Sequence, residues 1–207
     1  MKKFKPLFER ACCRIFDDSK VVNKEQLELI MKAGQTAPSA KNRQPYYFVA
    51  IINKDCREEI YKAAEEGRKK QFAHLSKQGL EKTSKGGTGS NDKSIYDASA
   101  AILVFRDSDP LYKEAKSQSK NLDIKEEQGV ACTALAMMLQ AHHMGLNTGW
   151  ICSPLYIKDE LKNILTKYGV DFNDNWEPRF IIPIGYSKTK LKKAPRRELE
   201  EKSCFVE

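Results

Sequence analysis

The stretch from Asp123 to Ser153 constrains the fold more than any other part of this chain. Asp123 and Glu126 have the spacing of a capping box, in which a carboxylate on the first turn reaches back to the helix start. The apolar residues that follow cover more than one helical face: Val130, Ala131, Ala134, Leu135, Met137, Met138, Leu139, Ala141 and Met144. We expect a helix buried on most sides that ends at Gly145, since glycine readily adopts the left-handed conformation. These residues are equally compatible with an ordinary core helix and with a helix in a subunit interface.

Length and composition predict one soluble domain over residues 1–207. No apolar run reaches the roughly 20 residues of a membrane span, and the start "MKKFKPLFER" lacks the apolar run of a secretory signal. The six cysteines form no CxxC pair and no Cys/His cluster with zinc spacing. We therefore expect a cytoplasmic protein without a metal site and without membrane association.

The net charge of +8 is compatible with a polyanionic partner such as nucleic acid. The lysines are spread widely, however, and alternate with acidic residues, which is typical of a solvated surface. A basic nucleic-acid-binding protein is kept as an alternative, but no nucleic-acid partner is expected.

Local signals predict further helices and three strands. Helices are expected at 4–13, after Asn23 with Gln26 as its capping-box partner, after Asp55 with Glu58 as partner, and at 156–169. Buried strands are expected at 46–52, 99–105 and 179–186, and Pro183 indicates an edge position or a bulge for the last of these. Helices and strands are mixed without a regular βαβ rhythm, so we predict an α+β fold, a small sheet flanked by helices.

Residues 67–95 differ from the rest because they are rich in Lys, Gly and Ser. We interpret them as a mobile excursion or lid, part of which Phe72 and Leu75 could anchor as a helix. A solvated loop without function is the default interpretation. "GGTGS" at 86–90 is not taken as a phosphate-binding loop, because no strand and helix flank it.

The usual catalytic motifs are absent, and arginines at the two ends of the chain are the main candidate ligands. GxSxG, a P-loop and a GxGxxG between strand and helix do not occur. Arg10 and Arg14 lie four residues apart with Cys12 between them, and Arg196 and Arg197 follow Pro195. Guanidinium groups bind phosphate in a bidentate manner, so these residues suit a phosphate-bearing ligand.

Four motifs follow one another along the chain: "RACCRIF" at 10–16, "APSAKNRQP" at 37–45, "GLNTGW" at 145–150 and "APRR" at 194–197. Their order resembles the nitroreductase family of flavoproteins. The family's Arg-Arg-Ser-x-Arg-x-Phe corresponds to "RACCRIF" at 10–16, in which Ala11 and Cys12 replace a basic residue and a serine. Its Ala-Pro-Ser-x-x-Asn-x-Gln-Pro corresponds to residues 37–45, and its Gly-Leu-Gly-Thr-x-Trp to residues 145–150. Its final Lys-Pro-Arg corresponds to "APRR", with Arg196 in register. The resemblance extends from Phe8 to Arg197, and the second motif is the most specific.

This resemblance implies an α+β homodimer, of a domain-swapped type, that binds FMN in two sites at the subunit interface. Residues Arg10, Ala11, Cys12 and Arg14 would hold the phosphate and the ring edge, with Arg196 closing the phosphate site. Pro38, Ser39 and Asn42 would come from the partner subunit. The segment of Trp150, Ile151 and Cys152 would run beside the flavin ring. A backbone amide of this segment would lie close to the reactive nitrogen of the ring.

The implied activity is transfer of electrons from NADH or NADPH through FMN to an electron-poor small molecule such as a nitroaromatic or a quinone. The chemistry then belongs to the flavin, and no catalytic side chain is expected. A flavin-binding, storage or regulatory protein with little turnover is the main alternative. Reductive dehalogenation and flavin breakdown, which branches of this family perform, are further possibilities.

Overall fold

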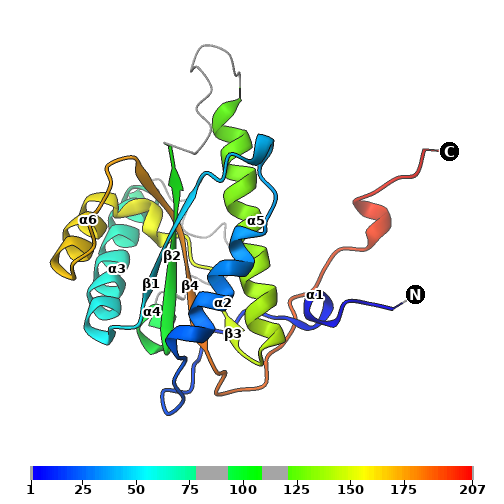
Figure 1. Ribbon diagram of the computed structural model, residues 1–207, viewed down its shortest axis with the longest axis horizontal. Helices are drawn as coiled ribbons and strands as arrows, with labels where there is room; N and C mark the ends of the chain where they lie inside the picture. The colour runs from blue at the N-terminus through cyan, green and yellow to red at the C-terminus, as the bar shows by residue number, and fades with distance from the viewer. Residues whose placement is uncertain (1, 78–92, 109–120, 207) are drawn as a thin grey trace.

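The computed structural model describes residues 2–77, 93–108 and 121–206. A four-stranded antiparallel sheet lies at its centre in the order β1-β2-β4-β3 (Figure 1). The strands are β1 (Tyr46–Ile51), β2 (Ala100–Asp107), β3 (Asn147–Thr148) and β4 (Trp176–Gly185). The three predicted strands are confirmed, and so is the α+β class. β3 was not anticipated as a strand.

Helices cover both faces of the sheet and give the molecule three layers. On one face lie α2 (Lys24–Gln35) and α5 (Leu122–His143); on the other lie α3 (Lys54–Lys77), α4 (Lys93–Asp97) and α6 (Lys158–Lys167). The side chains of β2 alternate between the two layers, since Ile102 and Val104 pack towards α5 while Leu103 and Phe105 pack towards α3 and α6. Both faces of this strand are therefore buried, as the sequence predicted.

The central helix α5 begins and packs differently from the prediction. Its N-cap is Asn121, in the left-handed region at φ 70°, and no side chain caps the helix. The expected capping box is wrong because both carboxylates bond to arginines instead, Asp123 to Arg106 and Glu126 to Arg43. The predicted end is confirmed, since Gly145 has φ +78°.

Burial of α5 on most sides is not seen within one chain. One face packs on the sheet through Val130, Ala134, Met137 and Ala141, among others. The opposite face is exposed yet largely apolar. Its residues include Ile124, Ala131, Cys132 and Leu135.

Helix α3 extends ten residues past Gly67, where the sequence suggested its end. A Cβ atom at Gly67 would lie 2.4 Å from Cγ2 of Ile157, so this glycine allows close packing rather than ending the helix. The N-terminal acceptor is also two residues earlier than predicted, because the side chain of Asn53, not Asp55, accepts from the backbone of Cys56 at 2.9 Å. The first part of the expected excursion is thus helical, whereas residues 78–92, including "GGTGS", lie outside the described residues.

Other local predictions have mixed outcomes. The capping box of Asn23 and Gln26 at the start of α2 is confirmed in both directions. β1 is an edge strand and only partly buried. The edge position predicted from Pro183 is wrong, because β4 is an interior strand. β4 does contain a bulge, but it lies at Arg179, where the register with β2 shifts, and not at Pro183. On the side of β4 that faces Gly149, the amide of Gly149 donates to the carbonyl of Pro183 at 3.1 Å. This contact needs no N–H group from the proline.

The two ends of the chain lie together beside α5 (Figure 1). The first helix, α1 (Lys5–Glu9), is shorter than the predicted 4–13, although Pro6 does occupy its first turn. Beyond β4 the chain continues as an extended tail with one short 3-10 helix, Leu199–Glu201. Short 3-10 helices also occur at Ala40–Asn42 and Ser153–Tyr156. Within the described ranges, no helix is long and apolar enough to cross a membrane.

Candidate functional site

The N-terminal and C-terminal segments together line an open depression of ≈ 570 Å³. The lining residues come from α1, from the segment that follows it and from the C-terminal tail. They are Leu7, Phe8, Arg10, Ala11, Cys12, Arg14, Lys192, Lys193, Ala194 and Arg196. Five residues predicted to bind the phosphate and ring edge therefore share one surface, although nearly the whole sequence separates Arg10 from Arg196.

The segment from Arg10 to Arg14 is held in place by the sheet. Cys12 forms a parallel bridge with Thr148 in β3, and the amide of Cys13 donates to the carbonyl of Thr148 at 2.8 Å. Cys13 is buried, and a Cβ atom at Gly149 would lie 3.0 Å from its carbonyl oxygen. Glycine at position 149 permits this close approach without a shift of the Cys13 carbonyl. Arg14 and the Cys12 side chain are exposed.

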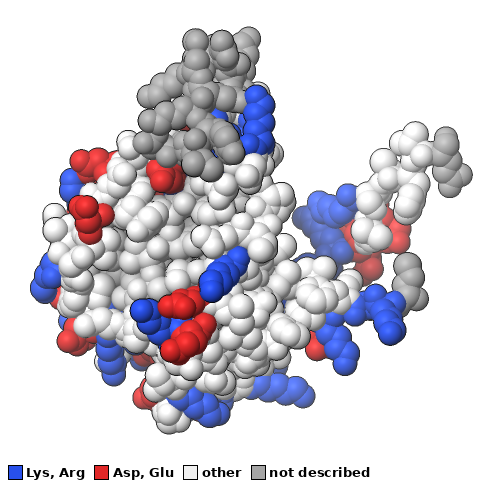
Figure 2. All heavy atoms as spheres, in the orientation of Figure 1, with Lys and Arg blue, Asp and Glu red and all other residues white. Residues whose placement is uncertain are grey.

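The depression is electrostatically suited to an anion. Its charged lining residues are all basic, and among the described residues none of Arg10, Arg14 or Arg196 pairs with a carboxylate. The Arg196 guanidinium donates from Nη1 to two backbone carbonyls, those of Ala194 at 3.1 Å and Pro195 at 3.0 Å. Figure 2 shows Lys and Arg on the terminal segments, with acidic residues beside them. Unneutralised guanidinium groups around one hollow can bind phosphate by charge-assisted hydrogen bonds.

The segment from Trp150 to Cys152 continues from the same sheet edge. The Trp150 ring packs on Phe180 at 4.3 Å between centroids, and its Nε1 donates to Sγ of Cys152 at 3.1 Å. Ile151 is buried, and both its amide and its carbonyl bond to Ile181 in β4. The amide of Ile151 is therefore not available to a ligand. Backbone alternation directs the amides of Trp150 and Cys152 away from β4.

The third predicted group lies at the other end of α5. Ser39 packs against the first half of this helix, since a Cβ atom at Gly129 would lie 3.1 Å from that of Ser39. Cys12 and Thr148 lie near the helix C-terminus, about 20 Å away along the axis at 1.5 Å per residue. A single chain therefore does not bring Pro38, Ser39 and Asn42 together with Arg10 and Arg14.

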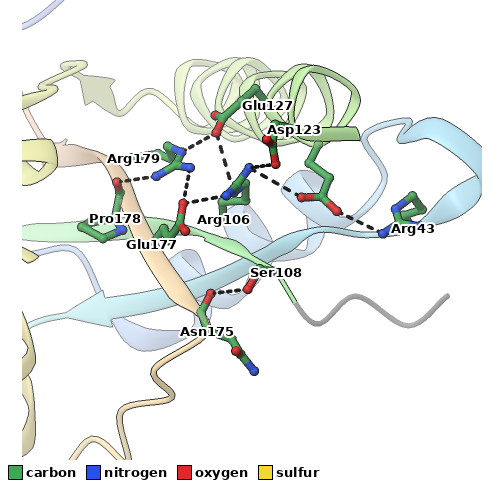
Figure 3. Close-up of polar contacts among 10 residues, drawn as sticks. Arg43, Arg106, Ser108, Asp123, Glu127, Asn175, Glu177, Pro178 and Arg179 are labelled. Atoms are coloured by element: carbon green, nitrogen blue, oxygen red, sulfur yellow. Dashed lines mark hydrogen bonds and ion pairs between the residues drawn. The ribbon is translucent and has the colours of Figure 1, made fainter. Parts of the chain in front are cut away.

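A group of arginines and carboxylates surrounds this same N-terminal end of α5 (Figure 3). Arg106 donates to Asp123 and to Glu177, both at 2.8 Å. Arg179 donates to Glu127 and Glu177, both at 2.6 Å. Further along, Arg43 donates to Glu126 at 3.0 Å, and Glu126 also lies 3.7 Å from Arg106.

Two members of this group, Glu177 and Arg106, have shifted pKa values. Burial acts to raise the pKa of Glu177, but the hydrogen bond from Arg179 and the charge of Arg106 outweigh it and hold that pKa below its ordinary value. Burial acts to lower the pKa of Arg106, but the bond to Asp123 and the charge of Glu177 raise it above its ordinary value. Each partner thus stabilises the charged form of the other.

Comparison with known proteins identifies the family. The sequence profile of the nitroreductase family matches residues 7–186, which is most of the chain. The chain belongs to the nitroreductase family. A curated relative from Haliscomenobacter hydrossis named iodotyrosine deiodinase is 29% identical over 164 residues, which cover 78% of this chain and 69% of that protein.

Solved structures of nitroreductase-like proteins have the same fold. The BluB-like flavoprotein of Clostridium difficile 630 superposes with a TM-score of 0.80 at 21% identity, covering 100% of both chains. A nitroreductase with bound FMN from Bacteroides fragilis gives a TM-score of 0.71 at 22% identity, covering 98% of this chain and 97% of that one.

Sequence reasoning missed part of the depression in this nitroreductase-family chain. Lys192 and Lys193 line it, and the basic run "LKKAPRR" before Arg196 was a visible signal for them. Phe8 also lines the depression, and no motif in the sequence indicates this position. The ion pair of Arg43 and Glu126 was also missed, because 83 residues separate the two.

Proposed function

We propose that this protein is an FMN-dependent oxidoreductase that passes electrons from NADH or NADPH to an electron-poor small molecule, such as a nitroaromatic or a quinone. The observation that carries the proposal is the depression in which Arg10, Arg14 and Arg196 meet without carboxylate partners among the described residues. These are the positions at which the family motifs place phosphate ligands.

The lining of the depression suits the phosphate of FMN. A phosphate monoester carries a charge of about −1.5 to −2 at neutral pH and offers three acceptor oxygens. Arg10, Arg14 and Arg196 supply planar donors, while Lys192 and Lys193 add positive charge at the rim. Charge-assisted bonds of this kind contribute roughly 1.5–3 kcal/mol each.

The segment from Trp150 to Cys152 is suited to the ring end of the ligand. Its backbone is hydrogen-bonded to β4, and the Trp150 ring packs against the ring of Phe180. The amide of Cys152 is the candidate donor to the ring, because the amide of Ile151 already bonds to β4. FMN supplies the hydride and electron chemistry when bound, so the side chains of this chain serve to bind, orient and exclude water.

We further propose a homodimer in which each site uses both chains. Two observations support it: the exposed apolar face of α5, with Ile124, Cys132 and Leu135, and the separation of Ser39 and Asn42 from Arg10 in one chain. Covering the exposed face by a second copy would remove this apolar area from water. Light scattering at micromolar concentration should give a dimer, and a monomer with flavin still bound would contradict this arrangement.

The visible spectrum of the purified protein, followed by steady-state kinetics, tests the proposal. We expect flavin absorption bands, and oxidation of NADH or NADPH that depends on an added quinone or nitroaromatic. Bound flavin without turnover would indicate a storage or regulatory protein instead. A colourless protein that does not take up added FMN would contradict the proposal.

Reductive dehalogenation is a second candidate, favoured by the relative named iodotyrosine deiodinase. Both activities need the same flavin site and differ in the acceptor. Release of iodide from iodotyrosine by the reduced protein, at a rate above that of nitroaromatic reduction, would favour this candidate.

A further inference from the structure

The loop before β1 has an unusual backbone. Lys41, Asn42 and Gln44 have φ values of 54°, 53° and 52°. Residues other than glycine avoid this left-handed region, because the Cβ atom there crowds the backbone carbonyl. Three such residues within four positions need surrounding contacts that favour this one conformation.

Hydrogen bonds join parts of the loop to one another and attach its end to β2. The amide of Gln44 donates to Oγ of Ser39 at 3.0 Å, and the amide of Asn42 donates to the Ser39 carbonyl at 2.9 Å. The carbonyl of Pro45 accepts from the amide of Asp107 in β2 at 3.2 Å. Ser39 therefore retains its hydroxyl proton for another acceptor, and the Asn42 side chain remains exposed.

One side chain of the loop points into the protein. Arg43 is 3% exposed, and its Nη2 donates at 3.0 Å to Glu126, which is equally buried on α5. Nε and Nη1 of Arg43 are buried and have no hydrogen-bond partner among the residues that the structure describes. Glu126 is held in turn by Arg106, at 3.7 Å.

A buried ion pair of this kind is a poor source of stability. Removing two charges from water costs free energy that their attraction only partly offsets, and two apolar residues of similar shape often serve as well. The incompletely satisfied guanidinium of Arg43 adds to that cost. What the pair provides, and apolar contacts do not, is a directed bond between the loop and α5.

We propose that Arg43 and Glu126 are positioning residues for the flavin site, because their ion pair holds the loop in its left-handed conformation and so orients Ser39 and Asn42. This inference rests on the proposed function, in which these two residues contact FMN bound mainly by the partner subunit. Arg43 and Glu126 themselves touch no ligand. In the proposed site Arg10, Arg14 and Arg196 hold the phosphate, and Ser39 and Asn42 are not among these phosphate ligands, so loss of the pair should affect FMN and riboflavin equally.

The test compares flavin affinity with stability in matched variants. The dissociation constants of FMN and riboflavin are measured by quenching of flavin fluorescence, together with the unfolding midpoint of each variant. In Arg43→Met/Glu126→Met both charges are replaced, so no unpaired buried charge remains and the fold should be retained. We expect both flavins to bind about tenfold more weakly, which corresponds to the loss of about one hydrogen bond.

Arg57→Met is the matched control. Arg57 is 4% exposed in α3, on the opposite face of the sheet, and donates to the carbonyl of Ile52. This variant should lower the unfolding midpoint while both dissociation constants change less than about twofold. An equal loss of affinity in Arg57→Met and in the double variant would show a general effect of destabilisation and overturn the inference.

The remaining outcomes are also decisive. Wild-type affinity in the double variant would overturn the positioning role while leaving the proposed function intact, whereas a wild-type protein that binds no flavin would overturn the proposed function itself. If the double variant does not fold, Arg43→Gln/Glu126→Gln also replaces both charges, and so leaves no unpaired buried ion, while keeping polar side chains at both positions. It should weaken both flavins about threefold, and unchanged affinity in Arg43→Gln/Glu126→Gln would contradict the inference.

Discussion

Two groups of arginines lie at opposite ends of α5 and differ in what surrounds them. The open arginine group, Arg10, Arg14 and Arg196, lines the depression formed by the chain termini. The paired arginine group consists of Arg43, Arg106 and Arg179. Its partners are four carboxylates, three of them in the first two turns of α5 and one in β4: Asp123, Glu126, Glu127 and Glu177.

The difference teaches how to separate a binding site from an architectural ion cluster. In the paired arginine group positive charge is already neutralised, and three of the carboxylates lie near the positive end of the helix dipole, which stabilises them further. In the open arginine group no described carboxylate neutralises the charge, so an added anion gains the full interaction. The side-chain type is the same, and the state of its partners decides the role.

The largest expected effect concerns stability in the paired arginine group. Arg106→Met leaves Glu126 and Glu177 with one cation fewer, and loss of one partner from a buried pair is strongly destabilising. We expect the free energy of unfolding to fall by about 3 kcal/mol, measured by chemical denaturation of the protein without flavin. Arg197→Ala, an exposed arginine in the tail, should change it by less than about 0.5 kcal/mol. Equal effects would remove the distinction between the groups.

The open arginine group should show the reverse pattern. Arg10→Ala should weaken FMN at least about tenfold and leave riboflavin affinity nearly unchanged, since a charge-assisted bond to phosphate contributes about 1.5–3 kcal/mol. Stability should remain within about 0.5 kcal/mol of the wild type because the side chain makes no ion pair among the described residues. Arg197, which does not line the depression, again provides the control. Equal losses for both ligands would show that Arg10 does not contact phosphate.

Lowering the pH should also distinguish the two arginine groups, with a smaller effect on the free energy of unfolding. The pKa of Glu177 is lowered from its ordinary 4.5 in the folded protein, so its contribution to stability is present above that value and is lost as pH falls through the lowered pKa. Between about pH 5 and pH 3, wild type should therefore lose more unfolding free energy than Glu177→Gln. Arg10→Ala should lose as much as wild type. Parallel curves for wild type and Glu177→Gln would place the acid-sensitive contacts elsewhere.

Local signals predicted the fold well where the interaction was itself local. The capping box of Asn23 and Gln26 involves neighbouring residues, and the conformation of Gly145 depends on its own backbone. Asp123 and Glu126 have the same capping pattern, but Arg106 and Arg43 engage them from distant segments. Gly67 resembled a helix stop, and only its contact with Ile157 reveals why a glycine occurs inside α3.

The candidate site was predictable to the extent that its motifs are contiguous. The sequence motifs placed Arg10, Arg14 and Arg196 in one phosphate site, and the structure brings them together in one depression. The pairing of Arg43 with Glu126 depends on the packing of a loop against α5, which no local pattern records. The same holds for the state of the arginines, because sequence alone does not show which guanidinium groups acquire carboxylate partners.

The smallest expected effect tests whether Cys12 belongs to the open arginine group. Cys12 is exposed in the depression, between Arg10 and Arg14, where the family motif has a serine. A thiol is a weaker donor than a hydroxyl, so Cys12→Ser should strengthen FMN binding by about 0.5–1.5 kcal/mol, the net contribution of one ordinary hydrogen bond. Cys204→Ser, which replaces another exposed thiol in the tail, should leave FMN affinity unchanged.

Labelling of Cys12 gives an independent measure of the same position. Bound FMN should cover this thiol and repel its reactive thiolate form, so a thiol reagent should modify Cys12 more slowly with FMN than without it. Fragmentation of the labelled peptide by tandem mass spectrometry distinguishes it from its neighbour Cys13, which is buried and should react slowly in both states. Equal labelling of Cys12 with and without FMN, together with unchanged affinity in Cys12→Ser, would place this residue outside the phosphate site. The open arginine group would then bind its anion through guanidinium and ammonium groups alone, without the position that the family fills with serine.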